Sequence, residues 1–269
     1  MSVRPWSGVA YNGATESENR IHGDDVARRY GFRGGLVPGV TVYAYLAEPA
    51  IREWGLDWLS RGAASVVLRK PLYDHARFQT EVTPESARAY SGRVIDENGV
   101  VCADGRVWMP PVLPPAPVRR GDAPVVEVEA RPPVTRAALE ALRASGMGAL
   151  RLQWRGDGEM GRTMHELDEM SDLVRPDGVG FANPGFVLGL ANWALARNVR
   201  LDAWIHAQSD AQNFAAIPLG AQLVVESRIT DLFARGGHEF VDLDVSAFID
   251  DRAVMTAQHR AIYRLRETS

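Results

Sequence analysis

Cysteine is nearly absent from this chain, which has one cysteine, Cys102, among 269 residues. A single cysteine excludes a disulfide within the chain and any metal site built from several thiolates. Its place in the apolar run VVCADGRVW, residues 100–108, predicts a buried thiol. We therefore expect a reducing compartment, with the cytoplasm as the default localisation.

Long apolar runs and an excess of positive charge are also missing. No stretch approaches the ~18 apolar residues that a membrane span requires, and the N-terminal segment lacks the apolar core of a signal peptide. The formal net charge is −4, whereas nucleic-acid-binding proteins usually carry a basic surface. We therefore expect neither a membrane nor a nucleic acid among the partners.

Motifs for metal ions, nucleotides and serine nucleophiles are missing as well. The 6 histidines are dispersed, and none belongs to an HExxH or similar metal-binding cluster. Gly34-Gly35 opens no GxGxxG motif, and the chain contains no Walker loop and no GxSxG elbow. The sequence predicts no metal site and no cofactor of its own.

What the chain does contain is enough apolar sequence, 46% of its residues, to bury a complete core. The proline-rich stretch 109–134 cannot hold a helix or a central strand, because proline lacks the backbone donor that both require. A helical pattern follows at 135–145. We therefore place an N-terminal domain at 1–115, a proline-rich linker with a short helix at 116–148, and a C-terminal domain at 149–269.

The two domains follow one plan. Each has a Pro-Gly that opens a helical pattern, at Pro38 and Pro184, and each reaches a Pro-Leu at almost the same interval, at Pro71 and Pro218. Strand-like runs follow, and the alternation of apolar and polar residues over 241–249 is typical of a strand buried on one face.

The two helical patterns differ in their expected regularity. The second, 182–199, is apolar nearly all round, which predicts a helix wrapped by a curved sheet. The first, 36–55, contains Pro49, which we expect to kink the helix or to end it one turn early.

This pattern resembles the hotdog fold in its fused, double form, an α+β fold in which two antiparallel sheets each wrap a long helix. The resemblance is to the MaoC-like hydratases and dehydratases of acyl thioesters. The family has an Asp-x-Asn-Pro-Leu-His element, and Asn19-Arg20-Ile21-His22 is similar to its end. The family's next segment, Gly-Phe and then Ile-x-His-Gly, is similar to Gly31-Phe32 and residues 34–39. The resemblance implies that one chain is a pseudo-dimer with one continuous sheet, and two such chains could pair further as a homodimer.

Carried over residue by residue, the resemblance places the catalytic histidine at His22 and the glycine whose amide binds the thioester carbonyl at Gly39. The family's catalytic aspartate falls on Ser17, which cannot act as a base at neutral pH. A carboxylate of Glu16 or Glu18, or an acid from elsewhere, would then have to partner His22. A histidine near neutral pKa suits proton transfer, and a helix N-terminus suits a developing oxyanion.

The substrate that the resemblance implies is an acyl thioester, carried by coenzyme A or by the phosphopantetheine arm of an acyl carrier protein. Arg69 and Lys70 are candidates for binding its phosphates, because guanidinium and ammonium groups match phosphate oxygens. His165 is either a second-copy counterpart of His22 or part of a solvated helix face. His206 and Asn192 are expected to be packing residues.

Three functions stay open at this stage. The first is reversible hydration or dehydration of an acyl thioester, with His22 as base. The second is thioester hydrolysis on the same fold, in which a carboxylate such as Glu48 would activate water. The third is a degenerate hotdog that binds a small apolar ligand without catalysis.

Overall fold

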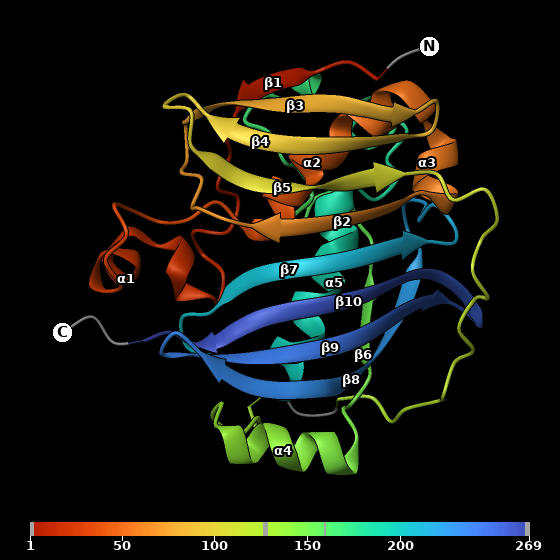
Figure 1. Ribbon diagram of the computed structural model, residues 1–269. Coiled ribbons are helices and arrows are strands. Elements are labelled where there is room, and N and C mark those ends of the chain that lie inside the picture. Colours follow the sequence, from red (N-terminus) through yellow and green to blue (C-terminus); the bar gives the residue numbers. More distant parts are fainter. Residues whose placement is uncertain (1–2, 126–128, 159, 267–269) are drawn as a thin grey trace.

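The computed structural model describes residues 3–125, 129–158 and 160–266, and one large antiparallel sheet dominates it (Figure 1). Within these ranges the sheet has ten strands, in the spatial order β1-β3-β4-β5-β2-β7-β10-β9-β8-β6. Two long helices, α2 (Gly39–Trp54) and α5 (Pro184–Asn198), lie side by side on one face of it.

Each half of the chain supplies five of these strands. The first half contains β1 (Trp6–Val9), β2 (Ala63–Leu68), β3 (Arg77–Ser86), β4 (Ala89–Asp96) and β5 (Val101–Trp108). The second half contains β6 (Leu150–Gln153), β7 (Ile205–Asn213), β8 (Gln222–Arg235), β9 (His238–Ile249) and β10 (Arg252–Arg264). Cys102 lies on β5 and is buried, as predicted.

The two halves join through β2 and β7, which pair antiparallel with Ala63 opposite Gln212 and Val67 opposite Gln208. This ladder makes the two sheets continuous, so that backbone groups which would be exposed at two sheet edges are paired instead. The prediction of two strand-and-helix units with one shared sheet is therefore confirmed.

The helix α5 is the wrapped helix that its apolar sequence predicts. Its N-cap Asn183 accepts a hydrogen bond from the Phe186 amide at 3.0 Å and donates to the Met160 carbonyl at 2.7 Å, which ties the helix start to the preceding loop. At Gly185 a Cβ would lie 3.2 Å from the Val40 carbonyl oxygen, so glycine lets α5 approach the start of α2.

Of the two effects predicted for Pro49, a kink or an early end, the early end is wrong, because α2 continues to Trp54. Proline cannot donate to the carbonyl four residues before it, that of Tyr45. The buried Thr80 hydroxyl donates to this carbonyl instead, at 3.0 Å. The Tyr90 hydroxyl likewise donates to the neighbouring Leu46 carbonyl at 2.7 Å. Thr80 on β3 thus supplies the hydrogen bond that proline removes, and Tyr90 on β4 bonds to the next carbonyl of the helix.

The segment between the halves crosses the outside of the sheet before it reaches α4 (Arg136–Ser145), where a helix is predicted (Figure 1). The carboxylate of Glu226, on β8 and buried, fixes this crossing by accepting from the backbone amides of Arg120, Gly121 and Asp122 at 2.7, 2.9 and 3.2 Å. The proline-rich chain is therefore held in place by a buried acid.

The other helices are short and come between strands only in the order along the chain. They are η1 (Arg20–His22), α1 (Asp24–Arg29), α3 (Leu56–Arg61) and η2 (Leu167–Glu169). No helix in the described part of the chain is long and apolar enough to cross a membrane.

Candidate active site

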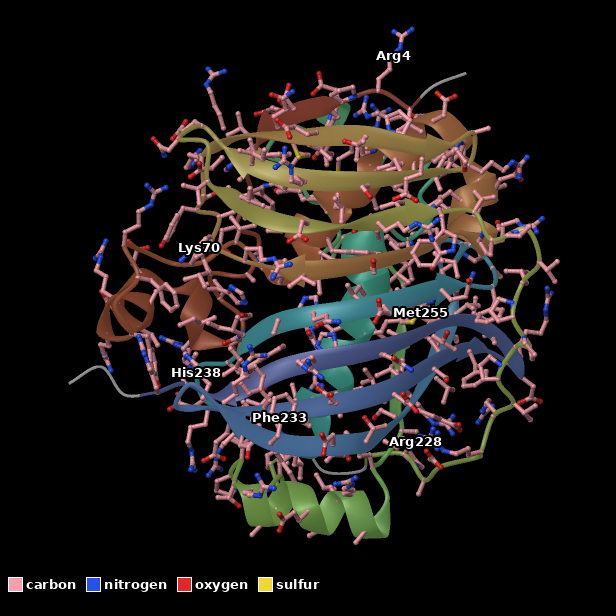
Figure 2. All side chains as sticks on the ribbon, viewed as in Figure 1. Arg4, Lys70, Arg228, Phe233, His238 and Met255 are labelled. Atoms are coloured by element: carbon pink, nitrogen blue, oxygen red, sulfur yellow. The ribbon has the colours of Figure 1, made fainter. Side chains whose placement is uncertain are left out.

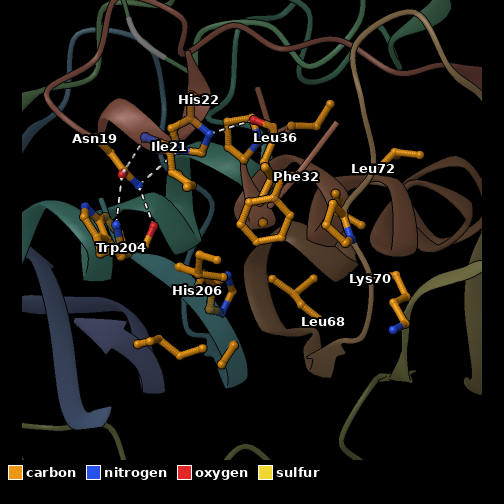
Figure 3. Close-up of a pocket in the computed structure, with 18 of the residues that line it drawn as sticks. Asn19, Ile21, His22, Phe32, Leu36, Leu68, Lys70, Leu72, Trp204 and His206 are labelled. Atoms are coloured by element: carbon orange, nitrogen blue, oxygen red, sulfur yellow. Dashed lines mark hydrogen bonds between the residues drawn. The ribbon is translucent and has the colours of Figure 1, made fainter. Parts of the chain in front are cut away.

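A cavity of about 260 Å³ opens where the two halves meet, between the loop that carries η1, the start of α2 and the start of β7 (Figure 3). The first half contributes His22, Gly39 and Lys70 to its lining, and the second half contributes Trp204 and His206. A second cavity of about 120 Å³ adjoins it and shares five lining residues: Asn19, His22, Pro38, Asn192 and Trp204. His22 therefore stands where the two cavities meet.

The hydrogen bonds of His22 fix its tautomer. Its Nδ1 lies 2.7 Å from the Leu36 carbonyl oxygen, and because a carbonyl only accepts, Nδ1 carries the proton. Its Nε2 is then a lone pair, and this atom accepts from the Asn19 side-chain amide at 3.2 Å (Figure 3). His22 therefore presents an acceptor, and not a donor, to the cavities.

Asn19 is itself held in one orientation. Its Nδ2 donates to the Trp204 carbonyl at 3.0 Å, and its Oδ1 accepts from the Trp204 amide at 3.3 Å. The same oxygen accepts from the Ile21 amide and caps η1. This single side chain connects the His22 loop to Trp204, the residue just before β7.

The environment of His22 keeps its imidazole neutral. Burial lowers the pKa of His22 to about 4, and the hydrogen bond to Leu36 offsets only part of this effect. At neutral pH the ring is therefore a weak base whose conjugate acid is a strong proton donor.

The carboxylates predicted to partner His22 do not contact it. Glu18 instead forms an ion pair with Arg131, with N–O distances of 2.9 and 3.2 Å, and this hydrogen bonding lowers the pKa of Glu18. Glu16 is exposed. Ser17 lines the second cavity and donates to the Asn19 carbonyl at 3.3 Å. In the described part of the chain no carboxylate bonds to the His22 ring, so Glu18 is corrected to a partner of Arg131.

Gly39 lies at the start of α2, where helix amides lack partners within the helix. The Pro38 carbonyl accepts from the amides of Thr41 and Val42, whereas the Gly39 amide finds no acceptor among the residues described. A Cβ at Gly39 would lie 2.3 Å from Leu68 Cδ1 and 3.0 Å from His206 Nδ1. Only glycine fits here without moving its neighbours.

Arg69 and Lys70 follow β2 and line the mouth of the larger cavity. The guanidinium of Arg69 is engaged by the carboxylate of Asp104, which raises the pKa of Arg69. The exposed Lys70 ammonium bonds to nothing within the described ranges. His238, at the start of β9, lines the cavity from the other half, on the same side of the molecule as Lys70 (Figure 2).

A buried chain of three polar side chains borders this cavity and was not predicted. Nε2 of His206 lies 2.8 Å from the Ser209 hydroxyl, which lies 2.8 Å from Nδ1 of His259 on β10. Residues 206 and 209 would face opposite sides of a regular strand. A β-bulge at Ala207, which has no partner in β10, turns both inward.

The remaining candidates lie elsewhere or differ from expectation. His165 lies outside both cavities, where its Nε2 bonds to Asp74 at 3.0 Å and to the Ala10 carbonyl at 3.1 Å. Glu48 is buried against Arg52 and the Ser171 amide, and it too lies outside both cavities. Asn192 lines both, and its Oδ1 is buried without a partner in the described structure, so it is not a satisfied packing amide.

The sequence matches no protein-family model and no curated protein sequence. Solved structures match it in fold. A conserved hypothetical protein of Mycobacterium tuberculosis with a double hotdog fold has a TM-score of 0.60 and 15% identity, over 97% of this chain and 96% of that one. A putative MaoC domain protein dehydratase of Chloroflexus aurantiacus has a TM-score of 0.54 and 12% identity, over 97% and 95%.

The tesB protein of Mycobacterium avium subs paratuberculosis matches with a TM-score of 0.54 and 12% identity, over 98% of this chain and 94% of that one. These likenesses show that the chain has a double hotdog fold, which confirms the predicted α+β class. Identities this low show the fold alone, so the activity has to be argued from the cavity.

Proposed function

We propose that this protein catalyses the reversible dehydration of a 3-hydroxyacyl thioester to a 2-enoyl thioester, with His22 as its only proton-transfer group. The observation that carries the proposal is the fixed tautomer of His22, whose lone pair on Nε2 lies in the same cavity as the unpaired Gly39 amide. The resemblance of residues 19–22 and 34–39 to the MaoC-like enzymes supports an acyl thioester as substrate, and one fold neighbour is itself named as a putative MaoC domain protein dehydratase.

The chemistry balances with one imidazole. Nε2 of His22 takes the α-proton, and the electron pair moves through the α-carbon onto the thioester oxygen, where the Gly39 amide stabilises it. The electrons then return to form the α,β double bond, the C–O bond at the β-carbon breaks, and the imidazolium protonates the departing hydroxyl to give water. Syn elimination places both events on one face of the substrate, within reach of one ring.

Asn19 has two consequences for this reaction. Its amide now occupies Nε2 of His22, so the substrate has to displace that hydrogen bond before the ring can act as a base. The freed N–H can then hold the β-hydroxyl. The missing carboxylate leaves the imidazolium unpaired, which favours return of the proton but makes the first step slower than with an acid–histidine pair.

The mouth of the cavity suggests where the carrier group of the thioester lies. Lys70 is exposed there, and we propose that it binds a phosphate of coenzyme A or of a carrier-protein arm. Arg69 is a weaker candidate because the two carboxylate oxygens of Asp104 already accept from its Nε and Nη2.

The second candidate function is binding of an acyl thioester without turnover. It is favoured by the absence of any carboxylate bonded to His22 in the described structure, together with the hydrogen bond that occupies Nε2. Hydrolysis is the weakest candidate, because its proposed acid, Glu48, is bonded to Arg52 and lies outside both cavities.

One assay separates the three functions. The purified protein is mixed with a 2-enoyl coenzyme A, and the enoyl absorbance and free thiol are followed together. Hydration removes the absorbance and releases no thiol, hydrolysis releases thiol, and binding alone does neither but raises the melting temperature.

The role of His22 is tested by substitution. We expect His22→Ala to lower kcat at least ~100-fold, the scale of losing a general base. His75→Asn, at an exposed histidine outside both cavities, is the matched control and should leave kcat unchanged. Equal rates for His22→Ala and the wild type would refute the proposal.

A further inference from the structure

The three-residue chain of His206, Ser209 and His259 leaves a nitrogen without a partner at each of its two ends. All three side chains are buried, with exposed fractions of 4%, 1% and 2%. Neither Nδ1 of His206 nor Nε2 of His259 has a hydrogen-bond partner in the described structure. Buried polar groups are normally paired, so these two atoms require an explanation.

The two ends differ in their surroundings. The His206 ring lines the larger cavity, beside the start of α2, and its Nδ1 lies 3.0 Å from the point where a Gly39 Cβ would be (Figure 3). His259 lines neither of the two cavities at His22. Only the His206 end can therefore meet a ligand bound beside Gly39.

Hydrogen-bond accounting leaves two arrangements of protons. The Ser209 hydroxyl has one proton and bridges two ring nitrogens, so one ring accepts it while the other donates to the hydroxyl oxygen. If His206 accepts, its Nδ1 carries a proton and His259 ends in a bare Nε2. If His206 donates, its Nδ1 is bare and His259 ends in an unpaired N–H.

The first arrangement is the less costly of the two. A buried N–H without an acceptor is rarer in proteins than a bare acceptor. The first arrangement places its unpaired N–H at the cavity, where a bound ligand can accept from it. The second arrangement leaves an unpaired N–H at His259, away from both cavities.

We propose that His206 donates a hydrogen bond from Nδ1 to the thioester carbonyl oxygen, beside the Gly39 amide, and that Ser209 and His259 hold it in the tautomer that does so. This inference deepens the proposed function and rests on it. His206 then becomes a second oxyanion donor, and Ser209 and His259 become positioning residues. The Leu68 side chain, which meets Gly39 at the same point, has to turn aside when the thioester enters.

A neutral imidazole is suited to this role. Burial lowers the pKa of His206 to about 3, and the backbone of Gln208 offsets only part of the effect. The ring therefore stays neutral at working pH and keeps one N–H to donate. Enzymes that polarise a carbonyl with a neutral histidine beside a helix N-terminus use the same physical arrangement.

Two substitutions at one position separate this role from packing. The amide nitrogen of His206→Asn falls near the place of Nδ1, whereas that of His206→Gln falls near the place of Nε2 and keeps the bond to Ser209. If Nδ1 is the donor, Asn should retain kcat within ~10-fold, and Gln should lose ~100-fold or more, the scale of one oxyanion donor. A packing role predicts the opposite order, because Gln preserves both volume and the Ser209 contact.

The tautomer is measured independently of turnover by NMR of ¹⁵N-labelled histidine, which shows which ring nitrogen carries the proton. The inference predicts a proton on Nδ1 of His206, and its loss from Nδ1 in Ser209→Ala. A proton on Nε2 in the wild type overturns it. If the wild type turns over no thioester, the proposed function fails, and the NMR result alone then decides the inference.

Discussion

Replacing Asn19 with aspartate tests the geometry of the site, because it places a carboxylate where an amide now contacts Nε2 of His22. The two side-chain nitrogens lie 3.2 Å apart. Two opposite unit charges at that distance attract by about 5 kcal/mol at an effective dielectric constant near 20, and by about 1 kcal/mol in bulk water. A change of one in pKa corresponds to 1.36 kcal/mol, so these two energies correspond to a rise of about 1 to 4 in the pKa of His22.

We expect Asn19→Asp to raise the pKa of His22 from about 4 to about 6 or 7. The assay is the chemical shift of the His22 ring protons followed over pH. Glu18→Gln is the control, since the Glu18 carboxylate is held by Arg131 and its loss should leave the pKa of His22 unchanged. A pKa that stays near 4 in Asn19→Asp would show that residue 19 does not face Nε2, and the proposed site geometry would be wrong.

Three further predictions concern stability and fit. Thr80→Val leaves the Tyr45 carbonyl unpaired and should lower the free energy of unfolding by about 1 to 3 kcal/mol in urea titrations. Adding Pro49→Ala should recover most of this loss of stability. No recovery would contradict the view that Thr80 replaces the hydrogen bond that Pro49 removes. Gly39→Ala places a methyl 2.3 Å from Leu68 Cδ1 and 3.1 Å from His206 Cβ, so these neighbours have to shift, and KM for a thioester should rise. An unchanged KM would show that the substrate does not approach this amide. Because the folded-state pKa of His22 is about 4 against a usual 6.5, the unfolded chain binds its proton first as pH falls. The free energy of unfolding should therefore fall between pH 6.5 and 4, and His22 should account for about 3 kcal/mol of that fall. The fall should be smaller in His22→Gln. Identical pH profiles of the two proteins would refute the lowered pKa of His22.

The fold was largely predictable, because it depends on patterns that are local in the sequence. Three local patterns each indicate an element with a buried face: the Pro-Gly at Pro38, the Pro-Gly at Pro184 and the alternation at 241–249. The structure has a helix, α2 or α5, at the first two and the strand β9 at the third. That α2 continues past Pro49 was not predictable, for the opposite reason. The group that compensates for it, the Thr80 hydroxyl, comes from a strand 31 residues further along the chain.

The site was less predictable because its contacts join distant segments. His22 and Gly39 could be placed at one cavity through the family resemblance, but the partner of His22 is set by Asn19, whose orientation depends on Trp204, 185 residues away. The His206 chain depends on a bulge at Ala207 that brings Ser209 to the same face and opposite His259. A one-residue irregularity in a strand leaves no signal in the hydrophobic period.

Incubation with a 2-enoyl coenzyme A in ¹⁸O-labelled water, followed by mass spectrometry of the products, tests the proposed activity most directly. Hydration predicts one ¹⁸O on the β-carbon of an intact 3-hydroxyacyl thioester, formed by the wild type and not by His22→Ala. Label in a free carboxylate would identify a thioesterase, and no label in any product would identify a binding protein; either result contradicts the account.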